Sequence, residues 1–324
     1  MPTKLGQNFL RDKAVLDRII QSANLSGDDF VIEVGPGEGV LTKELARLAG
    51  KVIAIETDEE LAKKTAANLK FEIINLKSNL NYKISNYKKN TIIIGDILEI
   101  NLPELIENLR PEIIHKLADD ISPLPSPVSS TRHPLPKGEE EIPSYKVIAN
   151  IPYYITSPII RLFLETKYPP TEMILMVQKE VAERICAKAG KMSILALSVQ
   201  YYADAELLFT VPAKAFSPVP EVDSAVIRIT KKERPTYAEA STFVETTADK
   251  SAGEARNKED VKKFFRIVKA GFSAKRKTLV NNLSTSLKLE KSFAEEKLKQ
   301  IGISKNQRAQ ELSLEDWKKL VELL

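Results

Sequence analysis

Residues 30–58 read FVIEVGPGEGVLTKELARLAGKVIAIETD, and this stretch decides the fold. An apolar strand runs into a glycine-rich turn, apolar residues then recur at helical spacing, and a second apolar strand ends in the acid Glu56. A strand, a helix and a second strand in this order form one βαβ unit of a parallel sheet. We therefore expect an α/β fold with a ligand site at the glycine turn, where sheets of this kind leave a cleft.

Five further apolar runs continue the pattern along the chain. They lie at residues 91–95, 146–149, 173–177, 206–211 and 222–229, and helical patterns separate most of them. The last two are too close together for a helical crossover, which favours an antiparallel pair at the edge of the sheet. The sequence thus predicts a doubly wound, Rossmann-like, mostly parallel sheet of seven strands.

Three polar stretches interrupt this plan. Residues 75–90 are rich in Asn and Lys, residues 111–143 contain seven prolines and the acidic run Glu139 to Glu141, and residues 231–259 are polar and charged. Such compositions bury too little apolar surface to fold alone. We expect one domain over 1–230 with insertions at 75–90 and 111–143, a linker over 231–259, and a small all-helical domain over 260–324.

Composition excludes several classes of protein. The chain has 324 residues, a net charge of +4 and 43% hydrophobic residues, which suits a folded protein with a real core. The sequence has no apolar run of about 18 residues and no secretion signal at its start, so we expect a cytoplasmic protein. We also expect it to be a monomer. Cys186, His115 and His133 cannot build a zinc site of the usual kind, and both histidines lie in the proline-rich stretch, so we expect no metal and no serine–histidine triad.

The glycine turn indicates the type of cofactor. Gly35, Gly37 and Gly39 match a nucleotide-binding turn, but Val40 stands where the dinucleotide fingerprint requires Gly or Ala, which disfavours a nicotinamide cofactor. Glu56 ends the second strand, where a carboxylate can accept hydrogen bonds from ribose hydroxyls. Asp96 follows the third strand and can accept from an adenine amino group. This combination favours S-adenosylmethionine (SAM), although a tight turn and two surface acids would give the same residues.

The fourth strand ends in a tetrapeptide suited to methylating a nucleobase amine. It comprises Asn150, Ile151, Pro152 and Tyr153. The lone pair of such an amine is delocalised into the ring, so two acceptors aimed at its hydrogens would move it toward tetrahedral geometry. The Asn150 side-chain oxygen and the Ile151 carbonyl can supply them, Pro152 fixes the turn, and Tyr153 offers a face on which a base stacks. A loop with a buried tyrosine is the alternative.

At these residues the sequence resembles the ribosomal RNA adenine dimethyltransferases, in particular the enzymes that modify small-subunit (16S) RNA. The resemblance rests on KLGQNFL at 4–10, the glycine turn, GDILEI at 95–100, ANIPYYITSPI at 149–159, AFSPVPEVDSAV at 215–226, GFSAKRKTLVNNL at 271–283 and RAQELSLEDW at 308–317. It implies a class I SAM-dependent methyltransferase domain followed by a small helical domain, with SAM as cofactor and ribosomal RNA as partner.

The resemblance also implies roles for individual residues. Gln7, Asn8 and Leu10 would line the cofactor cleft, and SAM would be held by Gly35, Gly37, Glu56, Asp96 and Asn150. Phe216 would form a second aromatic wall for the base, although a core phenylalanine is an equal alternative. Arg276 and Lys277 would contact RNA phosphates. They lie in the stretch from Val261 to Lys288, which has eight basic residues and no acid. Such a stretch could equally be a solvated helix face.

Three functions remain open from the sequence. The first is dimethylation of two adjacent adenines in small-subunit RNA, with a role in subunit maturation. The second is dimethylation of large-subunit RNA, which confers macrolide resistance and in which isoleucine is also found at the position of Ile151. The third is a non-catalytic RNA-binding factor of ribosome assembly. VDSAV at 222–226 and the C-terminal RAQELSLEDW favour the first, and the intact Asn150 and Tyr153 disfavour the third.

Overall fold

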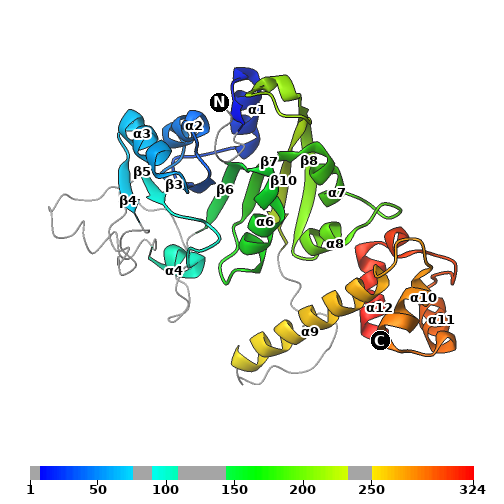
Figure 1. Cartoon of the computed structure of the whole chain (residues 1–324). Coiled ribbons are helices and arrows are strands. Elements are labelled where there is room, and N and C mark those ends of the chain that lie inside the picture. Colours follow the sequence, from blue (N-terminus) through cyan, green and yellow to red (C-terminus); the bar gives the residue numbers. More distant parts are fainter. Residues whose placement is uncertain (1–7, 76–89, 109–143, 233–249) are drawn as a thin grey trace. The chain divides into compact units, whose positions relative to one another are not determined.

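The computed structural model describes residues 8–75, 90–108, 144–232 and 250–324 (Figure 1). Side chains between 250 and 258 are outside this description. Gln7, nearly all of both expected insertions and most of the expected linker also lie outside the described residues. The contacts divide the chain into two compact units, one of residues 1–178 and 208–229 and the other of residues 179–207 and 230–324.

The first unit is built on a twisted, mostly parallel sheet. Parallel pairing joins β4 to β5, β5 to β3, β3 to β2, β2 to β6 and β6 to β7. The sheet order is β4 (Glu72–Asn75), β5 (Asn90–Ile94), β3 (Lys51–Glu56), β2 (Phe30–Val34), β6 (Tyr145–Asn150), β7 (Glu172–Gln178), β10 (Ser224–Lys231) and β8 (Ala203–Val211). The carboxyl ends of the four central strands therefore meet at one edge. The strand order reverses between β2 and β6, and ligands of open α/β sheets bind at such a switch point.

Within the described residues the main sheet has eight strands, one more than the seven expected. All seven expected strands are present, and β8 and β10 are neighbours at one end as predicted. The additional strand is β4, which pairs beyond β5 in parallel. Its four residues bury only Ile74, so its apolar pattern is too short to be recognised in the sequence.

Helices cover the sheet and fix the site-bearing strands. In the first unit they are α1 (Lys13–Ala23), α2 (Val40–Leu48), α3 (Glu59–Leu69), α4 (Leu102–Glu107) and α6 (Thr156–Glu165). The Asp12 side chain caps α1 by accepting from the Ala14 and Val15 amides, and Asp58 caps α3. Buried Leu16, Ile19 and Leu45 of α1 and α2 pack with the sheet residues Val31 and Ile148. This packing holds the strand ends at a fixed spacing.

The second unit is helical and begins earlier in the chain than the sequence predicts. It contains α7 (Lys179–Ile185), α8 (Ile194–Gln200), α9 (Lys250–Gly271), α10 (Leu279–Leu287), α11 (Lys291–Gln300) and α12 (Leu314–Leu323). Met192 and Leu197 share a core with Phe264 and the fully buried Trp317. The contacts group residues 179–207 with the segment from 230 onward, because residues 179–207 pack with the C-terminal helices. Helix α9 also begins ten residues before the expected start at 260.

Two details of the helical unit follow directly from its sequence. Ser313 and Asp316 form the capping box that the SLED stretch at 313–316 predicts, and α12 begins there. A Cβ on Gly271 would come within 2.3 Å of the Trp317 ring, so only glycine fits beneath this indole. Among the described helices of both units, none is long and apolar enough to cross a membrane.

Candidate functional site

The glycine turn after β2 provides close approach to whatever binds beside it. Gly35, Gly37 and Gly39 have φ values of +69°, +56° and +79°, a region that favours glycine. A Cβ on Gly37 would lie 3.1 Å from the Phe9 ring, and one on Gly39 would lie 2.6 Å from the Thr65 side chain. The backbone conformation therefore favours glycine at all three positions, and packing adds to this preference at Gly37 and Gly39.

Glu56 ends β3 directly beside this turn. Its side chain is 3% exposed, and its two carboxylate oxygens accept from the Gly37 amide at 3.2 Å and the Asp58 amide at 3.1 Å. Asp96 follows β5 at the same edge and accepts from the Leu98 amide at 2.9 Å. The parallel register, which pairs Glu56 with Ile94, brings these two carboxylates to the same end of the sheet.

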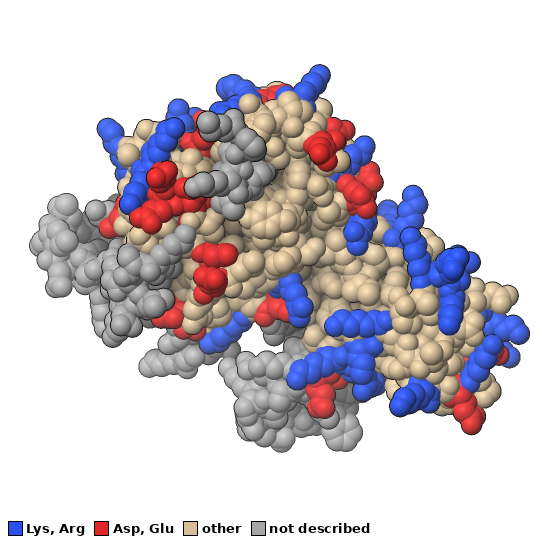
Figure 2. Space-filling view, in the orientation of Figure 1, with Lys and Arg blue, Asp and Glu red and all other residues tan. Residues whose placement is uncertain are grey.

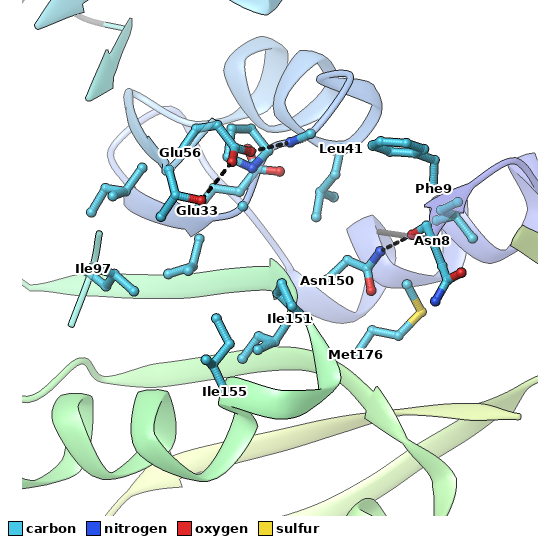
Figure 3. Close-up of a pocket in the computed structure, with 18 of the residues that line it drawn as sticks. Asn8, Phe9, Glu33, Leu41, Glu56, Ile97, Asn150, Ile151, Ile155 and Met176 are labelled. Atoms are coloured by element: carbon cyan, nitrogen blue, oxygen red, sulfur yellow. Dashed lines mark hydrogen bonds between the residues drawn. The ribbon is translucent and has the colours of Figure 1, made fainter. Parts of the chain in front are cut away.

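Asn150 ends β6 on the other side of the switch point. Its side-chain nitrogen donates to the Asn8 carbonyl at 3.4 Å, which leaves the amide oxygen as an acceptor (Figure 3). The buried Ile151 amide donates to the Met176 carbonyl of β7 at 3.2 Å and anchors the turn. The Tyr153 hydroxyl shares a 2.7 Å hydrogen bond with Ser224 of β10, which fixes the direction of the ring.

The chain's N-terminal segment closes one side of this site. Strand β1 (Phe9–Leu10) pairs antiparallel with β9 (Phe216–Ser217), so Leu10 lies opposite Phe216. Arg11 forms an ion pair of 2.5 Å with Glu38 of the glycine turn. Phe216 is 3% exposed, belongs to the core and also lines the site, while its role as a wall for the base stays a prediction.

These residues enclose one cavity of about 380 Å³ (Figure 3). The described lining contains every site residue expected in the first unit apart from Gln7: Asn8, Leu10, Gly35, Gly37, Glu56, Asp96, Asn150, Ile151, Pro152, Tyr153 and Phe216. Strand ends far apart in sequence thus supply one pocket of a size usual for small ligands.

Glu33 also lines this cavity and was missed by reasoning from sequence. It lies within β2, its side chain is 1% exposed, and its Oε2 has no hydrogen-bond partner among the described residues. Burial, with a smaller effect from the nearby Glu56 carboxylate, raises the pKa of Glu33 to about 8. The Thr42 hydroxyl faces the carboxyl and lowers this pKa, although its oxygen lies outside regular hydrogen-bond geometry. A single acid inside the apolar run FVIEV was the signal that could have identified it.

The residues present fit SAM. The glycine cradle admits close approach of a ligand, and an unpartnered buried carboxyl oxygen suits a ligand that carries positive charge. Glu56 is at a strand end of the kind where an acid binds a ribose in nucleotide-binding folds, and Asp96 is at the end of the neighbouring strand. When bound, SAM supplies an electrophilic methyl group on a sulfonium.

Arg276 and Lys277 lie in the other unit, in the turn between α9 and α10, and not on a helix face. Both are exposed, and neither forms an ion pair within the described part of the chain. Buried Asn282 holds the turn from below, since its side-chain nitrogen donates to the carbonyls of Gly271 and Ala274. Figure 2 shows many Lys and Arg side chains over the visible face of this unit.

Fold and cavity together define a class I SAM-dependent methyltransferase. A family model described as ribosomal RNA adenine dimethylase matches residues 1–249. A protein of Dehalococcoides mccartyi named ribosomal RNA small subunit methyltransferase A is 36% identical over 98% of this chain and 86% of its own length. The chain therefore belongs to the ribosomal RNA adenine dimethylase family.

Solved structures support the fold. The 23S rRNA methyltransferase ErmE aligns with a TM-score of 0.62 at 23% identity, covering 98% of this chain and 99% of that one. A dimethyladenosine transferase from Plasmodium falciparum gives the same TM-score at 22% identity, covering 96% and 95%. At these identities the similarity establishes the architecture alone.

Proposed function

We propose that this protein transfers methyl groups from SAM to the exocyclic amine of adenines in small-subunit ribosomal RNA. It dimethylates two adjacent adenines and thereby takes part in maturation of the subunit. The observation that carries the proposal is the single cavity in which the tetrapeptide from Asn150 to Tyr153 faces Glu56 and Asp96. The groups that would orient the amine and the groups that would hold the cofactor therefore line the same cavity.

The residues of β6 would prepare the adenine amine. The Asn150 amide nitrogen is engaged by the Asn8 carbonyl, so its oxygen is available to accept a proton of the amine. The Ile151 carbonyl supplies the second acceptor. Because Ile151 would act through its backbone carbonyl, leucine at this position would supply the same acceptor. Positioning and electrostatics, without a strong base, would supply most of the rate enhancement.

The aromatic groups would hold the base. Tyr153 is only partly buried, and its ring is fixed by Ser224, which suits stacking against an extruded adenine. Phe216 would form a second wall of the same cavity. On the cofactor side, Asn8, Leu10 and the glycine turn would enclose SAM, with Glu56 at the ribose and Asp96 at the adenine.

The helical unit would bind the RNA backbone. Arg276 and Lys277 are exposed in a turn that Asn282 holds rigid, and exposed cations of this kind suit phosphate contacts. We place the protein in the cytoplasm as a monomer, because its proposed substrate is a ribosomal precursor and the described cavity needs no second chain.

The choice of small-subunit RNA rests on sequence relatives. The relative at 36% identity carries a small-subunit name, whereas ErmE, which carries a 23S name, is 23% identical. The fold does not decide between the two RNA targets, since a 23S rRNA methyltransferase aligns along nearly the whole chain with a TM-score of 0.62. The large-subunit reaction is therefore the second candidate, and a purely RNA-binding role is disfavoured by Asn150 and Tyr153.

The test is a methylation assay on separated ribosomal subunits. Small and large subunits from cells that lack this activity are incubated with the protein and methyl-labelled SAM, and the labelled nucleotide is mapped. Label in small-subunit RNA supports the proposal. Label in large-subunit RNA supports the second candidate, and binding of RNA without transfer supports the third.

A further inference from the structure

The lining of the cofactor cavity contains carboxylates and no basic side chain among the described residues. The described lining contains Glu33, Glu38, Glu56 and Asp96, and no Lys, Arg or His. Three of the four are already satisfied: Glu38 pairs with Arg11, Glu56 accepts from two amides, and Asp96 accepts from one. Glu33 is the exception, because its buried Oε2 has no partner among the described residues.

Glu33 is also the carboxyl whose charge depends most on its surroundings. Its side chain is 1% exposed, so ionisation requires a charge to be created away from water. The groups that face it are the Glu56 carboxylate of β3, which opposes ionisation, and the Thr42 hydroxyl of α2, which favours it. With its pKa raised to about 8, the carboxyl is mostly neutral near neutral pH.

A positive charge entering this cavity would favour the ionised form of Glu33 over the protonated form. An opposite charge within about 4–6 Å favours the ionised form of a carboxyl, and the effect is strong where water is excluded. SAM brings a sulfonium, whereas the product S-adenosylhomocysteine (SAH) has a neutral thioether at the same atom. Both ligands carry the same amino and carboxylate groups, so they differ at this site chiefly in one charge.

We infer that Glu33 is the counter-charge to the sulfonium of SAM, that it loses its proton to solvent as SAM binds, and that it thereby favours SAM over SAH. The inference rests on SAM being the methyl donor. The proton of Glu33 is balanced over one turnover: Glu33 releases it on binding of the sulfonium and takes one up from solvent after transfer has left a neutral thioether. The proton that the adenine amine loses on methylation is a separate one and goes to solvent. Loss of the ion pair between Glu33 and the sulfonium then lowers the affinity for the product SAH.

The sign of the pH dependence follows. The ionised carboxylate binds the sulfonium better, so SAM affinity rises with pH up to the pKa of the free Glu33, about 8, and levels above it. The amino group of the ligand titrates in the same range, at about 7.7–8.0 in model compounds. Because SAH has the same amino group, its own pH dependence supplies the correction.

The experiment is calorimetric titration of the full-length protein with SAM and with SAH, near pH 7, in two buffers of different ionisation enthalpy. The difference between buffers gives the number of protons released. We expect wild type to release more protons with SAM than with SAH, and Glu33→Gln to abolish this difference.

The ratio of SAM affinity to SAH affinity should fall about tenfold in Glu33→Gln above pH 8, which corresponds to one pKa unit of interaction. Glu38→Gln is the matched control: it removes a cavity carboxylate that already has a cation, and proton release should be unchanged.

Two results would overturn the inference. Equal proton release with SAM and SAH in wild type would mean that Glu33 does not respond to the sulfonium. An unchanged difference in a folded Glu33→Gln protein would assign the proton to another group. Failure of wild type to bind SAM at all would instead contradict the proposed function, so the two failures are distinguishable.

Discussion

The cofactor cavity and the basic turn between α9 and α10 differ in the sign and in the burial of their charged groups. The described cavity lining contains two buried carboxylates, Glu33 and Glu56, and no cation, whereas the turn presents the exposed cations Arg276 and Lys277. In the cavity, hydrogen bonds are made by specific backbone amides to individual oxygens, as for Glu56. On the turn, Asn282 fixes the backbone and leaves the charged side chains exposed to solvent.

This difference in burial determines how much each residue can contribute to the free energy of ligand binding. Removing the partner of a buried polar group costs about 1–3 kcal/mol, because water cannot reach the group to replace the hydrogen bond. An exposed cation is screened by salt and contributes modestly, so binding through phosphates depends on several cations together. Single substitutions should therefore have large effects in the cavity and graded effects on the turn.

Asn150→Ala should give the largest effect. Its oxygen would act on the amine as charge develops, and removing one such preorganised group typically costs about 10²–10³ in rate. Single-turnover methylation under saturating SAM should fall by that order, with RNA affinity within a few fold of wild type. Wild-type rates in this variant would show that a different group orients the amine.

Glu56→Ala should weaken SAM binding by about 1–3 kcal/mol, the range for losing a buried polar partner. Calorimetry on the folded variant measures this. Glu60→Ala is the matched control, since Glu60 is an exposed acid in the first turn of α3 and should leave affinity unchanged. If both variants bind SAM equally well, Glu56 does not hold the ribose.

Replacing Arg276 and Lys277 by Ala should have a smaller, salt-dependent effect. RNA binding should weaken at low salt, and the slope of log K against log salt should become shallower by roughly 1 for each phosphate that is no longer neutralised. SAM affinity should not change. Lys291 and Lys299 of α11 are also exposed, so their double alanine variant controls for net charge. An equal slope in both double variants would mean that the turn has no special role.

Replacing residues 113–142 with a short glycine–serine linker should have the smallest effect. The segment contains no residue of the described cavity lining or of the basic turn, and its composition does not favour a packed core. Thermal unfolding and SAM affinity should match those of wild type. If the shortened protein binds SAM and no longer methylates subunits, the insertion recognises the substrate.

The sequence predicted those parts of the site that follow from strand ends. Gly35, Glu56, Asp96 and Asn150 each come directly after or at the end of an apolar run, and parallel pairing must bring such positions together. The structure places them around one cavity as expected, while their individual roles stay predictions. Gln7 lies outside the described residues.

Features that depend on distant contacts could not be predicted in the same way. The pairing of Leu10 with Phe216 joins segments more than two hundred residues apart, and two-residue strands have no periodicity. The role of Asn282 depends on which carbonyls lie above it, and the raised pKa of Glu33 depends on burial beside Glu56. Residues 179–207 lie between β7 and the middle of β8 in sequence, and only their packing around Met192 and Leu197 joins them to the helical unit.

The most direct test of the central claim is the identity of the methylated nucleoside. Small-subunit RNA is treated with the protein and SAM, digested to nucleosides and analysed by mass spectrometry, with Asn150→Ala in parallel. The account predicts N6,N6-dimethyladenosine at two adjacent positions with wild-type protein and little product with the variant. Methylation of another base, or dimethyladenosine formed equally well without Asn150, would contradict it.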